Sequence, residues 1–219
     1  MKLKKLLSSE TSHFIFKSIL AGLLIAVAGA IYLAVPKIIT DTNIASIVGS
    51  FLFSIGLIGV IALQANLYTG KIGYVNSKKT AIKAFWILLI NLGIAFVFGL
   101  LFKVVNPSSF NPFGPESVRL NKEWYKMLFD GFICGILIYL AVELNRVTKS
   151  YIPVIICVMA FILCGAEHCI ADAFYLATGE ITLKGLGYLG LAILGNTIGS
   201  LLIHYIQVGT EYSLDNIHR

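Results

Sequence analysis

The stretch CGAEHCIADAFYLATG (residues 164–179) decides how this chain folds, because it places three ionisable groups where lipid is expected. It follows VIICVMAFIL (residues 154–163), a run apolar enough to lie within a membrane. An isolated ion in an apolar medium is so unfavourable that such groups pair, become neutral or contact water. Ionisable residues within membrane spans are therefore read first as lining a cavity or pathway. We expect this of Glu167, His168 and Asp172; the alternative is a buried histidine that only locks helices together.

The whole chain is apolar, not only this stretch. Its 219 residues are 58% hydrophobic with a mean hydropathy of +0.86, whereas soluble domains are about 45–50% apolar. A helix needs about 20 apolar residues to cross the hydrocarbon core, and outer-membrane barrels would show short alternating segments instead. The sequence therefore predicts an all-α, polytopic membrane protein, a single domain over residues 1–219, with six transmembrane helices at 14–35, 44–66, 82–105, 128–145, 151–177 and 187–208.

Basic residues predict the orientation of these spans. Lysines and arginines are concentrated in the N-terminal tail, the second loop, the fourth loop and the C terminus, which all lie on one side. On the opposite side, Arg119, Lys122 and Lys126 of the third loop are offset by acidic residues. The positive-inside rule then places both termini in the cytoplasm. The net charge of +6 needs no nucleic acid partner, because basic residues meet anionic lipid. We expect a multi-pass protein of the cytoplasmic (inner) membrane.

The longest connection, residues 106–126, divides the predicted spans into three plus three. With an odd number of spans in each half, the two halves enter the membrane in opposite directions. That arrangement is an inverted repeat. We predict repeats at approximately residues 1–105 and 127–208.

Polar residues and glycine interrupt the second and fifth predicted helices at QANLYTGKIG (residues 64–73) and CGAEHCIADA (residues 164–173). The third and sixth helices carry NLG (residues 91–93) and GNTIG (residues 195–199). Interrupted hydrophobic segments at matching places in two halves are the best sequence indication of a binding site in such folds.

Gly165 indicates that the fifth helix breaks just before the ionisable residues. A break frees backbone groups that need partners or a cavity, and it creates a half-helix N-terminus whose dipole attracts anions. On an unbroken helix, His168 and Asp172 would share a face because they are four residues apart.

Three motifs together resemble those of the formate/nitrite transporter family. GAEHCIADAF (residues 165–174) is similar to the fifth-helix signature G-x-E-H-(S/C)-x-A-N-x-(F/Y). LYTG (residues 67–70) resembles the loop that interrupts the second helix, and GNTIGS (residues 195–200) resembles the sixth-helix G-N-x-I-G-G. The resemblance implies an aquaporin-like bundle, assembled as a homopentamer with one pore per subunit. It also implies passage of small monovalent weak-acid anions: formate, nitrite, hydrosulfide or short carboxylates. We expect no cofactor.

The resemblance also implies roles for individual residues. His168 corresponds to the central pore histidine, Glu167 to its neighbour that anchors the break, Thr69 to the loop threonine that faces the histidine, and Asn196 to the sixth-helix amide. Hydrophobic constrictions would come from Phe53 and Phe161 on the outer side and from Leu57, Leu67 and Tyr68 on the cytoplasmic side; Lys17 and Lys149 are vestibule candidates.

Three positions depart from the family's usual residues. Asp172 replaces a usual asparagine, Gly135 stands where the fourth helix often has asparagine, and Tyr68 stands where phenylalanine is commoner. These departures leave the preferred anion open. We expect the anion to move with a proton through His168, because apolar constrictions cannot replace an ion's hydration, whereas a neutral acid needs less.

Two other classes of function are alternatives. A transition-metal permease could use Glu167, His168, Cys169 and Asp172, with His204, as ligands, although His168 and Cys169 point in different directions on a helix. A membrane-embedded enzyme could use H-x-x-x-D as base and orienting group. However, the sequence has neither a G-x-S-x-G elbow nor an H-E-x-x-H zinc site.

Overall fold

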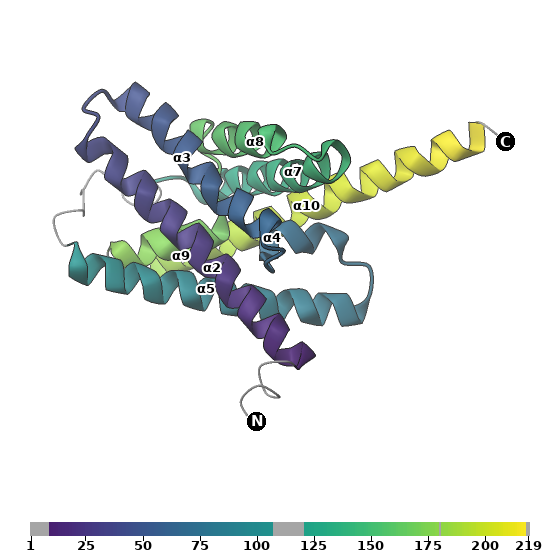
Figure 1. Ribbon diagram of the computed structural model, residues 1–219, viewed down its shortest axis with the longest axis horizontal. Coiled ribbons are helices and arrows are strands. Elements are labelled where there is room, and N and C mark those ends of the chain that lie inside the picture. The colour runs from purple at the N-terminus through teal and green to yellow at the C-terminus, as the bar shows by residue number, and fades with distance from the viewer. Residues whose placement is uncertain (1–8, 107–120, 180, 218–219) are drawn as a thin grey trace.

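The computed structural model describes residues 9–106, 121–179 and 181–217, which form helices joined by connections (Figure 1). Within these ranges, five helices are long and apolar enough to cross a membrane. Two shorter apolar helices, α8 (Ile152–Leu163) and α9 (Cys169–Thr178), lie where the sequence predicts the fifth span. The five long helices are α2 (Glu10–Ala34), α3 (Thr42–Ala62), α5 (Lys78–Val105), α7 (Trp124–Thr148) and α10 (Leu183–Ile217). The prediction of an all-helical, multi-pass membrane protein is confirmed.

Both predicted interruptions are present. α3 ends at Ala62, earlier than the predicted end at residue 66, and the chain continues into α4 (Tyr68–Lys71) and η2 (Ile72–Tyr74). The fifth span consists of α8 and α9, which are separated by residues 164–168. Figure 1 shows α4 and α9 in the interior of the bundle, between the long helices. The count of six spans and the inverted repeat stay predictions.

Polar side chains set where several helices begin. Asp41 Oδ1 accepts hydrogen bonds from the N–H groups of Asn43 and Ile44 at the start of α3, each 2.9 Å long. Ser77 and Thr80 form a capping box at the start of α5. Such caps satisfy N–H groups that have no partner within the helix. At the other end of α2, η1 (Val35–Lys37) extends the helix by one tight turn.

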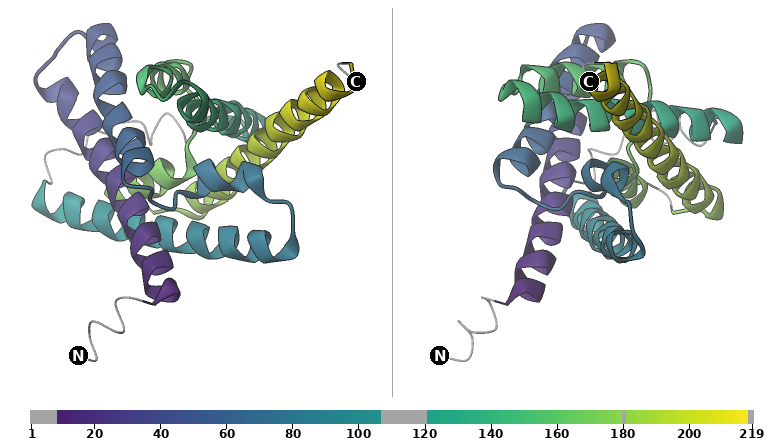
Figure 2. Two further views of the ribbon diagram at one scale, coloured as in Figure 1. Left: turned by 45° about the vertical axis from the view of Figure 1, so that its right-hand side comes forward. Right: turned by 90° about the vertical axis from the view of Figure 1, so that its right-hand side faces the viewer.

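Small residues bring α7 and α10 into backbone contact. A Cβ atom on Gly199 would lie 2.1 Å from the Phe132 carbonyl oxygen, and one on Gly135 would lie 2.3 Å from the Asn196 carbonyl oxygen. Small residues let two helices approach this closely. Gly135 therefore contacts the α10 backbone, and an asparagine at this position would force the two helices apart. Beyond this contact, α10 continues past the ends of the other helices (Figures 1 and 2).

Candidate functional site

The first helix break follows α3 and is held by a set of backbone bonds. Leu63 N donates to Gly59 O over 2.9 Å, and Ala65 N donates to Val60 O over 2.9 Å. Between them, Gln64 has a φ of 51°, which is unusual for a residue with a side chain. Asn66 N then donates to the backbone oxygen of Lys17 in α2, over 3.0 Å. The break is thus held against α2.

The second break, between α8 and α9, has the same backbone pattern. Cys164 N donates to Ala160 O over 3.0 Å, and Ala166 N donates to Phe161 O over 2.9 Å. Gly165 lies between them with a φ of 76°, a conformation that glycine adopts without strain. Glu167 N donates to the backbone oxygen of Asp130 in α7 over 3.2 Å. This break is held against α7 as the first is held against α2.

One asparagine side chain satisfies the backbone at each break. At the first break, Asn91 Oδ1 accepts from Tyr68 N at 2.9 Å, and its amide donates to the oxygens of Asn66 (3.1 Å) and Ser18 (2.6 Å). Asn91 is fully buried, and so is Asn196, which lies at the second break.

Asn196 repeats these contacts at the second break. Its Oδ1 accepts from Cys169 N at 3.0 Å, and its amide donates to the oxygens of Glu167 and Gly131, each at 2.8 Å. The family resemblance predicts that Asn196 lines the substrate pathway; in the structure, its amide group donates both hydrogen bonds to the backbone of the break.

The two breaks meet at Thr69 and His168. Thr69 Oγ1 lies 2.9 Å from His168 Nε2, and the two side chains are 1% and 2% exposed. His168 precedes α9, and its Nδ1 accepts a hydrogen bond from Ala171 N at 3.2 Å. Because Nδ1 is an acceptor, the neutral ring carries its proton on Nε2 and donates it to Thr69. The expected contact between threonine and histidine is therefore present.

Lys122 connects three acceptors beside the second break. Its Nζ donates to Glu167 Oε1 (2.6 Å), Asp130 Oδ2 (2.7 Å) and the Gly165 carbonyl oxygen (2.9 Å). Burial lowers the pKa of Lys122, but Glu167 and Asp130 outweigh this effect and raise the pKa above its usual value. The amine is thus a permanent cation. The sequence indicates only that Lys122 is a loop charge, because its partner Glu167 is 45 residues away.

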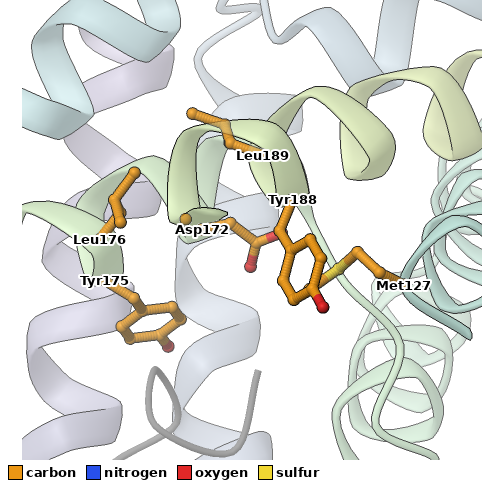
Figure 3. A pocket seen from close by; sticks show the side chains of 7 residues that line it. Met127, Asp172, Tyr175, Leu176, Tyr188 and Leu189 are labelled. Atoms are coloured by element: carbon orange, nitrogen blue, oxygen red, sulfur yellow. The ribbon is translucent and has the colours of Figure 1, made fainter. Parts of the chain in front are cut away.

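Asp172 lies in the first turn of α9, and His168 is the residue that caps this helix. The two residues therefore do not lie on one face of an unbroken helix. Asp172 lines a small cavity of about 30 Å³ between α7, α9 and α10 (Figure 3). The Tyr188 hydroxyl of α10 donates to the backbone oxygen of Lys122, so this cavity adjoins the Lys122 ion pairs. The lining residues are Met127, Asp172, Tyr175, Leu176, Gly185, Tyr188 and Leu189.

The aromatic constriction candidates lie next to the histidine. The Phe53 and Phe161 rings meet edge to face, with centroids 6.0 Å apart, and Phe161 stacks on His168 with centroids also 6.0 Å apart. Leu57, Leu67 and Tyr68 are buried as well. The Tyr68 hydroxyl lies 2.7 Å from Thr197 Oγ1 of α10, a contact that a phenylalanine could not make.

The two vestibule candidates lie in different settings. Lys17 is half-buried beside the first break, where its backbone oxygen receives the Asn66 bond. Lys149 is exposed at the end of α7, with a φ of 56°. Within the part of the chain that the structure describes, no three His, Cys, Asp or Glu side chains are grouped to hold a metal ion.

The chain matches a known protein family over most of its length. Residues 2–209 match the family model described as Formate/nitrite transporter. The chain belongs to the formate/nitrite transporter family. Since this is a family of transporters, the chain is not an enzyme.

Solved structures share the fold. One is an FNT family ion channel, with a TM-score of 0.81 and 22% sequence identity over 97% of this chain and 94% of that chain. Another is a pentameric formate channel with formate bound, with a TM-score of 0.75 and 19% identity over 94% of this chain and 97% of that chain. A comparison with curated proteins gave no match.

Proposed function

We propose that this transporter moves a small monovalent weak-acid anion, formate first and nitrite or hydrosulfide as alternatives, together with a proton. The observation that carries the proposal is the buried hydrogen bond between Thr69 and His168, at the point where two broken helices meet. The family assignment and the formate bound to the second structural neighbour support the class of substrate. His168 supplies or relays the proton, and Thr69 holds the small oxyanion by accepting from the histidine and donating its own hydroxyl proton.

The charges around the second break favour a neutral passenger. Lys122 is one cation between two carboxylates, Glu167 and Asp130, and the side chain of Asp172 lines a cavity with Tyr188, whose hydroxyl bonds the Lys122 backbone oxygen. An anion that passes His168 meets a surplus of negative charge, which is unfavourable at low dielectric. A neutral acid avoids this repulsion. Protonation of the anion before it passes His168 therefore lowers the barrier.

The remaining pathway residues have supporting roles. Phe53 and Phe161 form the outer constriction, and Leu57, Leu67 and Tyr68 form the cytoplasmic one. Glu167 and Asn196 keep the second break open. Lys17 and Lys149 raise the local concentration of anions at the mouths electrostatically.

We also propose six spans arranged as an inverted repeat. The matched bonds of Asn91 and Asn196 support this arrangement, because each side chain binds the break of its own half in the same way. We further propose that the protein lies in the cytoplasmic membrane with both termini in the cytoplasm. It assembles as a homopentamer, as the pentameric neighbour does. The mass of the detergent-solubilised complex tests the assembly.

Uptake of formate into proteoliposomes across an imposed pH gradient tests the function. An inward proton gradient is expected to accelerate uptake. The His168→Phe variant should lose about 100-fold in rate, because proton transfer by a positioned side chain contributes at least that much. His168→Asn keeps a polar group without a titrating ring, so it should retain slower uptake that ignores the gradient. His13→Phe, at an exposed histidine, is the matched control. Uptake that ignores the gradient in the unmodified protein, with His168→Phe unaffected, contradicts the proposal.

A further inference from the structure

The short segment that carries Thr69 is tied to the bundle at both ends. This segment, residues 67–74, contains the two short helices α4 and η2. At its start, the Tyr68 N–H is held by Asn91 and the Tyr68 hydroxyl by Thr197. Helices shorter than about 12 residues are not stable by themselves. The position of Thr69 therefore depends on contacts that the segment makes with other helices.

The far end of the segment is tied to a buried carboxylate. The Tyr74 hydroxyl donates to Glu143 Oε2 of α7 over 2.8 Å, and Glu143 is 5% exposed. The backbone is close at the same place, since a Cβ on Gly73 would lie 2.8 Å from the Tyr139 ring and 3.0 Å from the Ser200 carbonyl oxygen. η2 is thus pressed against both α7 and α10.

Glu143 also accepts hydrogen bonds from Arg146 of α7 and Gln207 of α10. Arg146 donates to both carboxylate oxygens, and Gln207 Nε2 donates to Oε1 over 3.1 Å. Tyr139 donates its hydroxyl proton to Gln207 Oε1 over 2.9 Å, so the 3.0 Å contact between Tyr139 and His204 Nδ1 has the histidine as donor. The chain of bonds runs from His204 through Tyr139 and Gln207 to the carboxylate. Glu143 is fixed in place by both helices.

The Tyr74 hydroxyl stays protonated and therefore remains a hydrogen-bond donor to Glu143. Burial, together with the Glu143 carboxylate, raises the pKa of Tyr74, so its phenol keeps its proton. Its ring also packs against the rings of Tyr139 and His204, with centroids 5.3 and 5.4 Å away. A Tyr74→Phe variant would lose the hydroxyl and keep these ring contacts.

We propose that Glu143 is a positioning residue, which acts through Tyr74 to hold the segment 67–74 so that Thr69 meets His168. The inference rests on the proposed function of the Thr69–His168 pair. Glu143 contacts neither the pair nor a passing anion in this role. It supplies the fixed anchor at one end of the segment, while Asn91 and Thr197 anchor the other end.

A double-mutant cycle in proteoliposomes separates this role from general destabilisation. Tyr74→Phe should slow formate uptake about tenfold, since a hydrogen bond to a charged acceptor shifts an equilibrium by about that factor. The bond from Tyr74 to Glu143, which holds the segment 67–74, is called the clamp. In a Thr69→Val background, Tyr74→Phe should add almost nothing, because the clamp acts through Thr69. Tyr205→Phe is the matched control: Tyr205 is exposed, and its hydroxyl makes a 3.4 Å bond to Val75 O. Normal uptake by Tyr74→Phe, or losses that multiply in the double variant, would overturn the proposal.

Nitrogen NMR of histidine-labelled protein distinguishes failure of the clamp from failure of the proposed function. If Thr69→Val transports normally, the proposed function fails, and the clamp is judged by the His168 Nε2 resonance alone. A changed resonance in Tyr74→Phe, with no change in Tyr205→Phe, supports the clamp. An unchanged resonance in Tyr74→Phe overturns it.

Discussion

The first and second helix breaks repeat the same backbone but carry different charges. Asn66 and Glu167 stand at matching positions, and their N–H groups donate to the backbone oxygens of Lys17 and Asp130. The Asn66 amide donates to a backbone oxygen, that of Phe14, at 3.4 Å. The Glu167 carboxylate instead binds the Lys122 amine. The backbone geometry alone thus makes a break, and the ionic chemistry is added at one break only.

The residues next in sequence differ in the same way. Leu67 follows Asn66 and is an apolar constriction candidate, whereas His168 follows Glu167 and binds Thr69. One break therefore contributes the hydroxyl and an apolar wall, and the other contributes the titratable ring. The two breaks therefore share a backbone pattern and differ in the chemistry of the side chains that they carry.

The largest expected effect is loss of the asparagine bonds that the two breaks share. Asn196→Ala leaves one buried N–H and two carbonyl oxygens without that side chain, at about 1–3 kcal/mol for each unsatisfied group. We expect the free energy of unfolding to fall by about 3–9 kcal/mol for the three groups together, and by a similar amount for Asn91→Ala. Thermal unfolding in detergent measures both.

Asn145→Ala serves as the control for this pair, because Asn145 makes a single amide bond to Ser150 O near the end of α7. If one of the two variants lost much stability and the other lost none, the two asparagines would not have equivalent roles.

A smaller effect is expected from the charge that distinguishes the breaks. Lys122→Met leaves the Glu167 and Asp130 carboxylates buried without their cation, and breaking such a pair costs about 3–5 kcal/mol. Adding Glu167→Gln should recover part of this loss, since one of the uncompensated charges is removed. Unfolding midpoints of the single and double variants measure the recovery. A double variant as unstable as Lys122→Met alone would show that the ion pair does not distinguish the breaks.

The smallest effect on stability concerns the residue in each break whose backbone has a positive φ, Gln64 or Gly165. Gly165→Ala should destabilise the protein by about 1–2 kcal/mol, because this backbone conformation strains any residue with a Cβ. A Cβ at Gly165 would meet no described atom within 4 Å, so sterics add nothing. Gln64→Gly, the reverse change at the first break, should be neutral or stabilising by less than about 1 kcal/mol. Stabilisation by Gly165→Ala would contradict the shared geometry.

Much of the fold followed from local sequence. The apolar runs predicted membrane helices, and Gly165 with its polar neighbours predicted the break between α8 and α9. The end of α3 was predicted four residues late, at residue 66 and not at Ala62. Residues 63–66 are as compatible with helix as with a turn, and the backbone bond from Asn66 to Lys17 that settles the matter is not local.

The candidate site was less accessible to sequence reasoning. The pairing of Thr69 with His168 came from the family resemblance, because the two residues are 99 positions apart. Lys122 was missed as the partner of Glu167, and nothing in its loop distinguished it from other basic residues. Gly135 drew attention as a missing asparagine, and the structure shows a close helix contact instead.

The sequence by itself determined that this chain is a membrane bundle with two interrupted helices, because hydropathy and glycine act on the residues nearest to them. The tertiary structure decided which groups face each other: threonine and histidine, Lys122 and Glu167, Tyr74 and Glu143. Apolar helices of similar composition can pack in many ways, and hydrogen bonds between distant residues form only in the arrangement where the helix backbones fit. The chemistry of the site depends on that fit.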